Sequence, residues 1–419
     1  MKKTKTKNGV WDLMLLFDIL QYGLLFWFAY WFIISLFGFG KARKLRNKLP
    51  EKKFVILIPA HNEEAVIGDL VANLNQMEYP KELYDVCVIA DNSNDRTAEI
   101  CRALGAIVLE HTSLPGEEKG KPYAIKYALE QLDMEQYDAV VVFDADNLVS
   151  LNYLQLMNNH LCAGEKLIQC YLDSKNPNDN AISLGYATSY YFMNRSWQLA
   201  KYRLGLGNAV GGTGFCVERG LLGRVGWTAR SLTEDLEFTM QCLLIGERAT
   251  WCHHARVYDE KPTGFKASCI QRLRWARGHW DVFFKYSLAL LKRSVLRGDI
   301  RAFDGFLYLL NPGKIVIGTA ASITFYIAYF TDASFVRPVL PLWVWLIFVS
   351  FNLIYIATTL RDSAQKINAV KAFISVFFVN YTYVPLFVWS LFTSGKRVWV
   401  RTEHTKSATL ESMTQKVGA

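Results

Sequence analysis

Apolar and polar positions divide the chain into a central part with short apolar runs and two ends with long ones. In the central part, residues 50–270, short apolar runs alternate with stretches in which apolar residues recur at helical spacing. Strands that alternate with helices in this way are typical of a mostly parallel sheet with helices on its faces, so we expect an α/β fold here. The pattern predicts strands over 54–59, 86–90, 107–110, 139–143 and 167–171, and helices over 62–77, 94–105 and 120–132.

The two ends contain long apolar segments. Residues 19–40, 315–331, 338–360 and 372–394 hold no Asp, Glu, Lys or Arg, and each is near or above the ~18 apolar residues that mark a membrane helix. Five Lys and Arg residues at 41–48 favour a cytosolic location for the central part, although residues 2–7 are basic too. All 8 Cys lie between 87 and 269, without the spacing of a disulfide framework, as is common in the cytosol. We therefore expect a multi-pass protein of the cell membrane with a cytosolic central domain.

These patterns give an expected domain organisation. The stretch 272–301 carries eight Lys or Arg residues against two Asp, which accounts for much of the net charge of +9. Because it adjoins an apolar segment, we expect it to contact membrane lipids and expect no nucleic-acid partner. The expected units are an anchor with a basic linker (1–49), a cytosolic domain (50–280), amphipathic interface helices (281–311), transmembrane helices (312–395) and a tail (396–419).

Polar residues follow three of the predicted strands. They are Ala60-His61-Asn62-Glu63, Asp91-Asn92-Ser93 and Asp144-Ala145-Asp146, and in such sheets the ligand binds at the carboxyl ends of the strands. The first strand is not followed by a glycine-rich phosphate loop. We therefore expect Asp144 and Asp146 to hold Mg²⁺ or Mn²⁺, which would bind a diphosphate. The alternative for this short motif is a solvated strand end with an N-cap Asp.

Seven short motifs follow one another along the central part of the chain. They are PAHNEE (59–64), ADNSND (90–95), EKGKPYA (118–124), FDADN (143–147), GGTGF (211–215), TED (233–235) and QRLRW (271–275). In this order they resemble the motifs of the membrane-embedded family-2 glycosyltransferases, the group with cellulose, hyaluronan, chitin and poly-N-acetylglucosamine synthases and ceramide glucosyltransferases. The resemblance covers roughly residues 54–280. It implies a GT-A type nucleotide-sugar-binding domain that transfers a sugar, with inversion, from a UDP-sugar donor.

The resemblance also implies roles for residues. Asp235 is the expected general base, with Glu234 as the second candidate, and apolar surroundings together with Glu234 should raise the pKa of Asp235. Expected contacts to the nucleotide-sugar are Ala60, His61, Glu63, Asp91, Lys119, Lys121, Asp144 and Arg274, and expected metal ligands are Asp144 and Asp146. Expected acceptor contacts are Gly212, Thr213, Gly214, Phe215, Gln271, Arg274 and Trp275.

Structural alternatives stay open for two of these motifs. Thr233 could cap a helix that carries acids in its first turn. QRLRW could be an amphipathic helix with a Trp at the membrane interface. For Thr233 the two interpretations are compatible, because a cap can also fix the base, whereas for QRLRW the interface helix competes with the functional interpretation.

Four functions are compared. The main expectation is a processive synthase that extends a polysaccharide, and the alternative is transfer of one sugar to a lipid-linked acceptor. The alternative stays open because three or four apparent spans are few for a polysaccharide channel within one chain. A homo-oligomer is also possible. A nucleotidyltransferase would need a glycine- and arginine-rich loop after the first strand, and a non-enzymatic nucleotide-sugar-binding protein would need neither TED nor QRLRW.

The C-terminal tail carries a loose similarity of its own. KRVWVRTEH (396–404) resembles the tryptophan-containing tail of hyaluronan-type enzymes, and we expect it in the cytosol. That side requires one of the apolar segments to be re-entrant or interfacial. We expect residues 372–394, which include Asn380 and Pro385, to be that segment.

Overall fold

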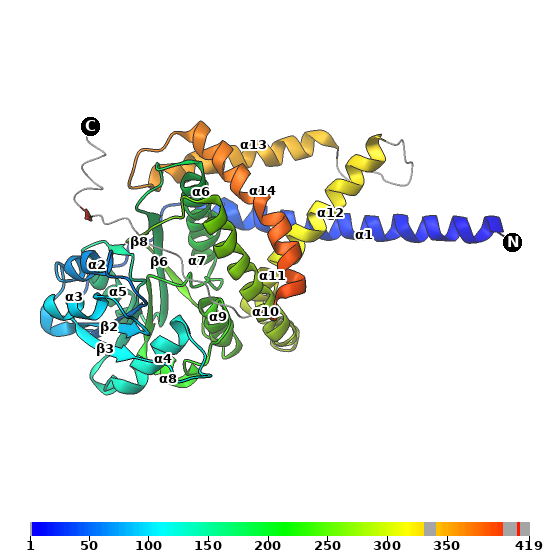
Figure 1. Ribbon diagram of the computed structural model, residues 1–419. Coiled ribbons are helices and arrows are strands. Elements are labelled where there is room, and N and C mark those ends of the chain that lie inside the picture. Colours follow the sequence, from blue (N-terminus) through cyan, green and yellow to red (C-terminus); the bar gives the residue numbers. More distant parts are fainter. Residues whose placement is uncertain (1, 331–340, 397–408, 411–419) are drawn as a thin grey trace.

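The computed structural model describes residues 2–330, 341–396 and 409–410 (Figure 1). A sheet with helices on both faces forms one side of the molecule, and long helices gather on the other side. Apart from Lys396, the expected tail motif lies outside the described residues.

The described strands form one eight-stranded sheet in the order β3-β2-β1-β4-β7-β6-β8-β5. Strands β3, β2, β1 and β4 run parallel, β6 is parallel to β8, and β7 runs antiparallel between β4 and β6. All five predicted strands are present, and the expected α/β fold with a mostly parallel sheet is confirmed. The bounds are β1 Phe54–Ala60, β2 Tyr84–Asp91, β3 Ile107–His111, β4 Ala139–Val142, β5 Leu148–Val149, β6 Leu167–Ser174, β7 Phe215–Glu218 and β8 Thr250–Asp259.

Two hydrophobic cores lie on the two faces of the sheet. Along β1, Phe54, Ile56 and Ile58 belong to one core, whereas Val55 and Leu57 belong to the other. This alternation explains why the central strands are almost entirely apolar, as strands buried on both faces are. The first core packs α2 (Ile67–Leu74), α3 (Thr97–Ala103) and α5 (Tyr153–Cys162), and the second packs α4 (Lys121–Gln131), α8 (Arg219–Val225) and α9 (Glu234–Leu244).

The remaining helices lie beyond the sheet, and α1 projects from the body of the molecule (Figure 1). The boundary expected between residues 280 and 281 falls inside a continuous helix, α10. These helices are α1 (Lys2–Leu36), α6 (Ala181–Met193), α7 (Ala200–Leu204), α10 (Phe265–Arg297), α11 (Ile300–Leu309), α12 (Asn311–Phe330), α13 (Leu342–Thr359) and α14 (Ala369–Thr393).

Two helices among the described residues are long and apolar enough to cross a membrane. They cover Phe17–Phe39 and Ala369–Phe392, and there are up to three such spans if the bent pair Ile300–Leu309 and Asn311–Thr324 is one span. The chain bends by 53° between the two helices of that pair. The segment that we expected to be re-entrant or interfacial forms the continuous helix α14, with Pro385 inside it, which speaks against a re-entrant loop and leaves the interfacial position a prediction. The break lies between α11 and α12.

Helix α14 packs closely on both α6 and α10. A Cβ added to Gly185 of α6 would lie 2.5 Å from the Ser375 carbonyl oxygen, so the absence of a side chain permits this approach. From α10, the buried Arg272 donates to the Val379 carbonyl oxygen at 2.7 Å and to Thr382 Oγ1 at 2.6 Å. Both contacts fix α14 next to the carboxyl ends of the strands.

Candidate active site

A cavity of about 1080 Å³ lies between the carboxyl ends of the strands and the helices α6, α10 and α14. Fifteen of the seventeen residues predicted from the motifs line it. They are Ala60, His61, Glu63, Asp91, Lys119, Lys121, Asp144, Asp146, Gly212, Thr213, Glu234, Asp235, Gln271, Arg274 and Trp275.

The loops after β1 and β2 are hydrogen-bonded to each other. The Asn62 amide donates to Ser93 Oγ at 3.1 Å, and the Asn94 amide donates to Asn62 Oδ1 at 2.8 Å. Asn62 and Asn92 have φ angles of 57° and 52°, in the left-handed region that Asn tolerates better than most residues. These contacts hold the loops in tight turns above the sheet.

Asp91 ends β2 inside this pair of loops. Its Oδ1 lies 2.7 Å from His111 Nδ1 and accepts from Asn92 Nδ2 at 2.8 Å. Its backbone oxygen lies 2.8 Å from His61 Nδ1. The end of β2 is therefore fixed by polar contacts on both sides, which suits the recognition of a polar group such as a ribose or a base.

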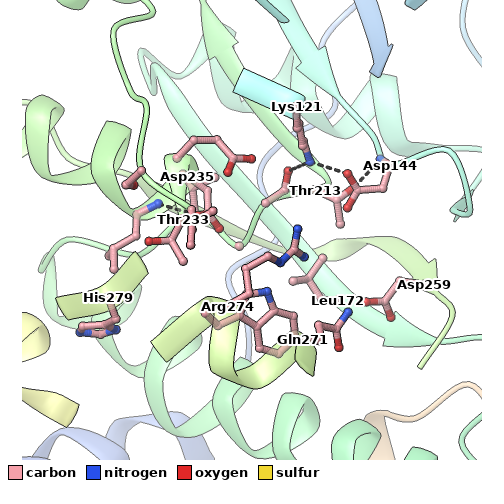
Figure 2. A pocket seen from close by; sticks show the side chains of 18 of the residues that line it. Lys121, Asp144, Leu172, Thr213, Thr233, Asp235, Asp259, Gln271, Arg274 and His279 are labelled. Atoms are coloured by element: carbon pink, nitrogen blue, oxygen red, sulfur yellow. Dashed lines mark hydrogen bonds and ion pairs between the residues drawn. The ribbon is translucent and has the colours of Figure 1, made fainter. Parts of the chain in front are cut away.

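Lys121, at the start of α4, connects two strand ends. Its ammonium forms an ion pair with Asp144 and donates to the Gly212 carbonyl oxygen at 2.7 Å (Figure 2). Burial would lower the pKa of Lys121, but the carboxylates of Asp144 and Glu234 raise it above its ordinary value. A charged lysine is thus held between Asp144 and Gly212 at the carboxyl end of β4. Lys119 is exposed at the edge of the cavity.

The carboxylates near Asp144 are the expected place for a divalent cation, but within the described residues no group of three or more His, Cys, Asp or Glu side chains is placed to hold one. Asp146 accepts from the Glu260 amide at 2.9 Å, and Asp259 accepts from Lys261 Nζ at 2.6 Å. Within the described part of the chain, Asp259 Oδ1 is buried and has no hydrogen-bond partner. Burial, opposed by Lys261, raises the pKa of Asp259, and the negative charges of Asp146 and Asp144 raise it further. Carboxylate oxygens are the ligand type that Mg²⁺ and Mn²⁺ prefer, and the metal site expected at Asp144 and Asp146 stays a prediction.

The TED motif begins α9 and faces the same cavity. Thr233 is the N-cap residue, but its side chain makes no capping bond, and among the described residues its buried Oγ1 has no partner. The capping-box alternative therefore does not describe this motif. Instead, Glu237 accepts from the amides of Arg230 and Ser231, both at 2.8 Å, and fixes the loop before the motif.

Asp235 has the properties of a general base at neutral pH. Burial and the adjacent negative charge of Glu234 raise the pKa of Asp235 to about 7. Burial also raises the pKa of Glu234, against the opposing charges of Lys121 and Arg274. A base works best when its pKa is near the working pH, and Asp235 meets that condition.

One face of α10 forms the wall opposite TED. Gln271, Arg274 and Trp275 lie on this face because residues three and four apart are neighbours on a helix. Arg274 extends into the space between Asp235, Thr213 and Asp259 (Figure 2). Among the residues that the structure describes, neither Gln271 Oε1 nor Arg274 Nε has a hydrogen-bond partner, although both atoms are buried. Such atoms are costly unless a ligand or water satisfies them.

The approach of α10 to TED depends on Gly278. A Cβ at this position would lie 2.6 Å from Thr233 Oγ1, closer than any side chain could remain without a shift. The glycine therefore sets how near Trp275 and Arg274 come to Asp235.

Beyond Trp275 the cavity reaches the helices that include the candidate spans. His279 stacks on Tyr308 with ring centroids 5.5 Å apart, and burial lowers the pKa of His279 to about 4, so the imidazole is neutral. The lining residues at this end are Tyr190 and Met193 of α6, Tyr308 of α11, Asn311 and Ile315 of α12, and Val379, Asn380, Tyr383 and Phe387 of α14. This end is aromatic and apolar, unlike the charged end near Asp144.

Two predicted acceptor residues lie outside the cavity lining. Phe215 is 1% exposed and packs in the core between the sheet and α9. A Cβ at Gly214 would clash with Cys170 and Val257 of the neighbouring strands, so this glycine serves sheet packing. Of the GGTGF motif, Gly212 and Thr213 face the cavity, and Thr213 Oγ1 accepts from the Asp144 amide at 3.0 Å.

Sequence reasoning missed several lining residues. Asp259 ends β8 and Lys261 follows it, and this strand was not recognised because of its mixed sequence, TWCHHARVYD. The contributions of α6 and α14 were missed because these segments were considered as connecting or membrane structure. An Asn within an apolar segment, Asn380, was the available signal.

A family model described as "Glycosyltransferase like family 2" matches residues 50–278. A probable glycosyltransferase of Bacillus subtilis, YdaM, is 27% identical over 397 residues, which cover 87% of this chain and 89% of the relative. A β-monoglucosyldiacylglycerol synthase of Trichormus variabilis is 29% identical over 292 residues, covering 67% of this chain and 58% of that enzyme.

A further relative and a solved structure extend the comparison. A poly-β-1,6-N-acetyl-D-glucosamine synthase of Staphylococcus aureus is 24% identical over 316 residues, covering 71% of this chain and 73% of the relative. A mannosyltransferase of Pyrobaculum calidifontis, solved with GDP-mannose and Mn²⁺, has 17% identity and a TM-score of 0.52, covering 88% of this chain and 99% of the other. The last match supports the fold alone.

Proposed function

This chain belongs to the glycosyltransferase-like family 2, whose members use nucleotide-sugar donors, and we propose that it transfers one hexose from a UDP-sugar to a lipid acceptor, with inversion. The observation that carries the proposal is the shape of the main cavity. It is continuous from Asp144 and Asp235 to Ile315, Val379 and Phe387 on α12 and α14. An acceptor held among these apolar helices can present a hydroxyl to Asp235.

The donor binds at the charged end. The loops after β1 and β2, which are hydrogen-bonded to each other, hold the nucleoside, and Lys121 faces the phosphates. Mg²⁺ or Mn²⁺ held by Asp144, Asp146 and Asp259 would neutralise charge on the departing diphosphate. The mannosyltransferase solved with Mn²⁺ agrees with this requirement.

The acceptor hydroxyl is deprotonated by Asp235. With its pKa at about 7, this carboxylate is largely ionised slightly above neutral pH and still basic enough to take a proton. The attacking oxygen then approaches the anomeric carbon from the side opposite the diphosphate, which gives inversion. Arg274, whose Nε has no partner among the described residues, satisfies a sugar or phosphate oxygen.

A growing polysaccharide is the second candidate acceptor. Trp275 favours it, because an indole at the acceptor end provides a flat surface on which the previous sugar ring can stack, as would suit a polymerising enzyme. The similarity to the poly-N-acetylglucosamine synthase points the same way. The lipid acceptor is preferred because this end of the cavity is lined by membrane-type helices, and because the similarity to the glucolipid synthase is somewhat higher.

The test uses the full chain purified in detergent with Mn²⁺. It is incubated with UDP-glucose, UDP-galactose or UDP-N-acetylglucosamine, with and without diacylglycerol, and UDP release and products are measured by mass spectrometry. A lipid carrying one hexose supports the first candidate. A ladder of sugar polymers supports the second and overturns the first.

The chain is membrane-associated, and we further propose a multi-pass topology with the active site in the cytosol. The five basic residues at 41–48, directly after the first candidate span, support this side. A cysteine placed at exposed Lys126 in an otherwise cysteine-free chain should resist an impermeant maleimide in intact cells and react after lysis. Labelling before lysis would contradict the proposed side.

A further inference from the structure

A second cavity, of about 300 Å³, lies away from the active site where the chain leaves α1. We call it the basic cavity, and its lining residues are Lys41, Arg43, Glu165, Tyr202, Arg203 and Arg248. Four of the six are cations. The first of them, Lys41, follows the candidate span Phe17–Phe39 by two residues.

The positive charge of the basic cavity is not neutralised by its one carboxylate. Glu165 accepts from Tyr202 OH at 2.7 Å and lies 2.7 Å from His160 Nδ1, so it is already engaged. Within the described part of the chain, no ion pair joins Lys41, Arg203 or any other cation of the cavity to a carboxylate. The cavity therefore has an excess of positive charge that an anion would relieve.

The cations are held in place by the backbone. Arg203 donates to the Lys41 carbonyl oxygen at 2.6 Å, and Arg248 donates to the Leu206 carbonyl oxygen at 3.0 Å. A Cβ at Gly40 would clash with the Arg203 guanidinium, so the glycine makes room for it. Burial and the nearby charge of Arg301 lower the pKa of Arg248, and the opposing negative charge of Glu165 does not offset them.

Exposed apolar side chains lie at the same end of α1 as the basic cavity. Phe37 and Phe39, at the end of the span, are 41% and 39% exposed, and Leu204, next to Arg203, is 38% exposed. A ligand that fits must offer a phosphate to the arginines and hydrocarbon to these side chains.

We propose that the basic cavity binds the phosphate of an anionic phospholipid from the adjoining membrane leaflet. Such a lipid would join the end of α1 to the turns at 165 and 248 of the catalytic domain. This inference is independent of the acceptor proposed above, because none of the six lining residues faces the active-site cavity.

The experiment measures binding of dihexanoyl-phosphatidylglycerol to the full chain in detergent by thermophoresis. Dihexanoyl-phosphatidylcholine and inorganic phosphate serve as comparison probes. The wild-type protein should bind the phosphatidylglycerol at least about tenfold more tightly than either, because charge-assisted bonds and apolar contacts act together. The double variant Arg203→Gln with Arg248→Gln should lose about tenfold or more in this affinity.

Two further variants guard against misfolding and general charge effects. Lys41→Gln with Arg43→Gln changes only exposed side chains and should also weaken binding. Arg96→Gln with Arg102→Gln removes two exposed cations elsewhere, which pair with Glu99 and Glu110, and should leave binding unchanged. Equal binding by the wild type and both cavity variants would overturn the proposal, as would equally tight binding of inorganic phosphate or of phosphatidylcholine.

Discussion

At the donor end of the active-site cavity, side chains come from loops that follow parallel strands, and Asp144 and Asp146 accept from a lysine and a backbone amide respectively. At the acceptor end, side chains come from α6, α10 and α14, and buried polar atoms of Gln271 and Arg274 have no partner among the described residues. The difference indicates that the donor end is pre-organised by the protein itself, apart from Asp259 Oδ1, which also has no partner among the described residues. The acceptor end is completed by what binds there.

The largest effect is expected from removing a carboxylate at the donor end. Asp146→Asn should abolish transfer and metal-dependent UDP-sugar binding, since a bound cation contributes several kcal/mol to stabilising the leaving group. Excess chelator should do the same to the wild-type enzyme. UDP release measures transfer, and calorimetry measures the binding of UDP-sugar. Full activity in excess chelator would show that transfer needs no cation at the donor end.

Asp235 lies where the two ends meet, so its replacement should separate binding from chemistry. Asp235→Asn should lower transfer by about 10²–10⁴, the usual contribution of a general base, and leave UDP-sugar affinity within a few-fold. Glu234→Gln is the matched variant on the adjacent residue. If Glu234→Gln loses more transfer than Asp235→Asn, the base assignment is reversed.

The raised pKa of Asp235 also has a stability consequence. Its folded pKa of about 7 is above the ordinary value of 3.8, so the folded state binds an additional proton between these values. The contribution of this group to stability is therefore present at low pH and lost as pH rises through about 7. Asp235→Asn should raise the melting temperature more at pH 8 than at pH 4.

The pH profile is the next largest effect. Because Asp235 must be deprotonated to act as base, kcat/KM should fall by about tenfold for each pH unit below about 7. UDP-sugar affinity at the donor end should change less over the same range. A flat profile for kcat/KM down to pH 5, measured as UDP release with acceptor present, would contradict the assignment.

The smallest effect is expected at the acceptor end. Trp275→Ala should raise the KM for the acceptor by about 3–10-fold, the worth of one aromatic contact, and leave the KM for UDP-sugar unchanged. Donor hydrolysis by water should persist. Trp227→Phe is the control, because Trp227 packs against the second core and does not line the cavity, although its indole donates to the Pro122 carbonyl oxygen at 3.0 Å. A matching rise in the donor KM would show that the two ends are not separable.

Sequence reasoning reached much of the donor end and, at the acceptor end, the face of α10 but not the contributions of α6 and α14. Parallel strands bring their carboxyl ends to one edge, so recognising apolar runs was enough to bring Asp91 and Asp144 together. Strand β8 was missed because His253, His254 and Arg256 interrupt its apolar pattern, and Asp259 was missed with it. Strand β8 is buried by neighbouring strands, and a local sequence pattern does not show which strands will be neighbours.

The QRLRW motif shows a second limit. Both arginines precede the same Trp, but Arg272 is 1% exposed and bonded to α14, whereas Arg274 enters the cavity. Helical spacing places them on different faces, and only the position of α14 decides which face meets substrate. GGTGF gives the same lesson, since Phe215 belongs to the core and not to the site.

Pro385 lies inside α14, between Tyr383 and Phe387 of the acceptor end. Proline has no amide hydrogen, so the Tyr381 carbonyl loses its helical partner and the helix is weakened at this point. Both parts of α14 are bonded to α10: Arg272 donates to the Val379 carbonyl oxygen before the proline, and Trp280 Nε1 donates to the Phe387 carbonyl oxygen after it. The lining residues Val379, Asn380 and Tyr383 lie before Pro385, and Phe387 lies after it. Substitutions on either side of the proline can therefore alter acceptor preference, while Asp235 on α9 and the transfer chemistry are inherited unchanged.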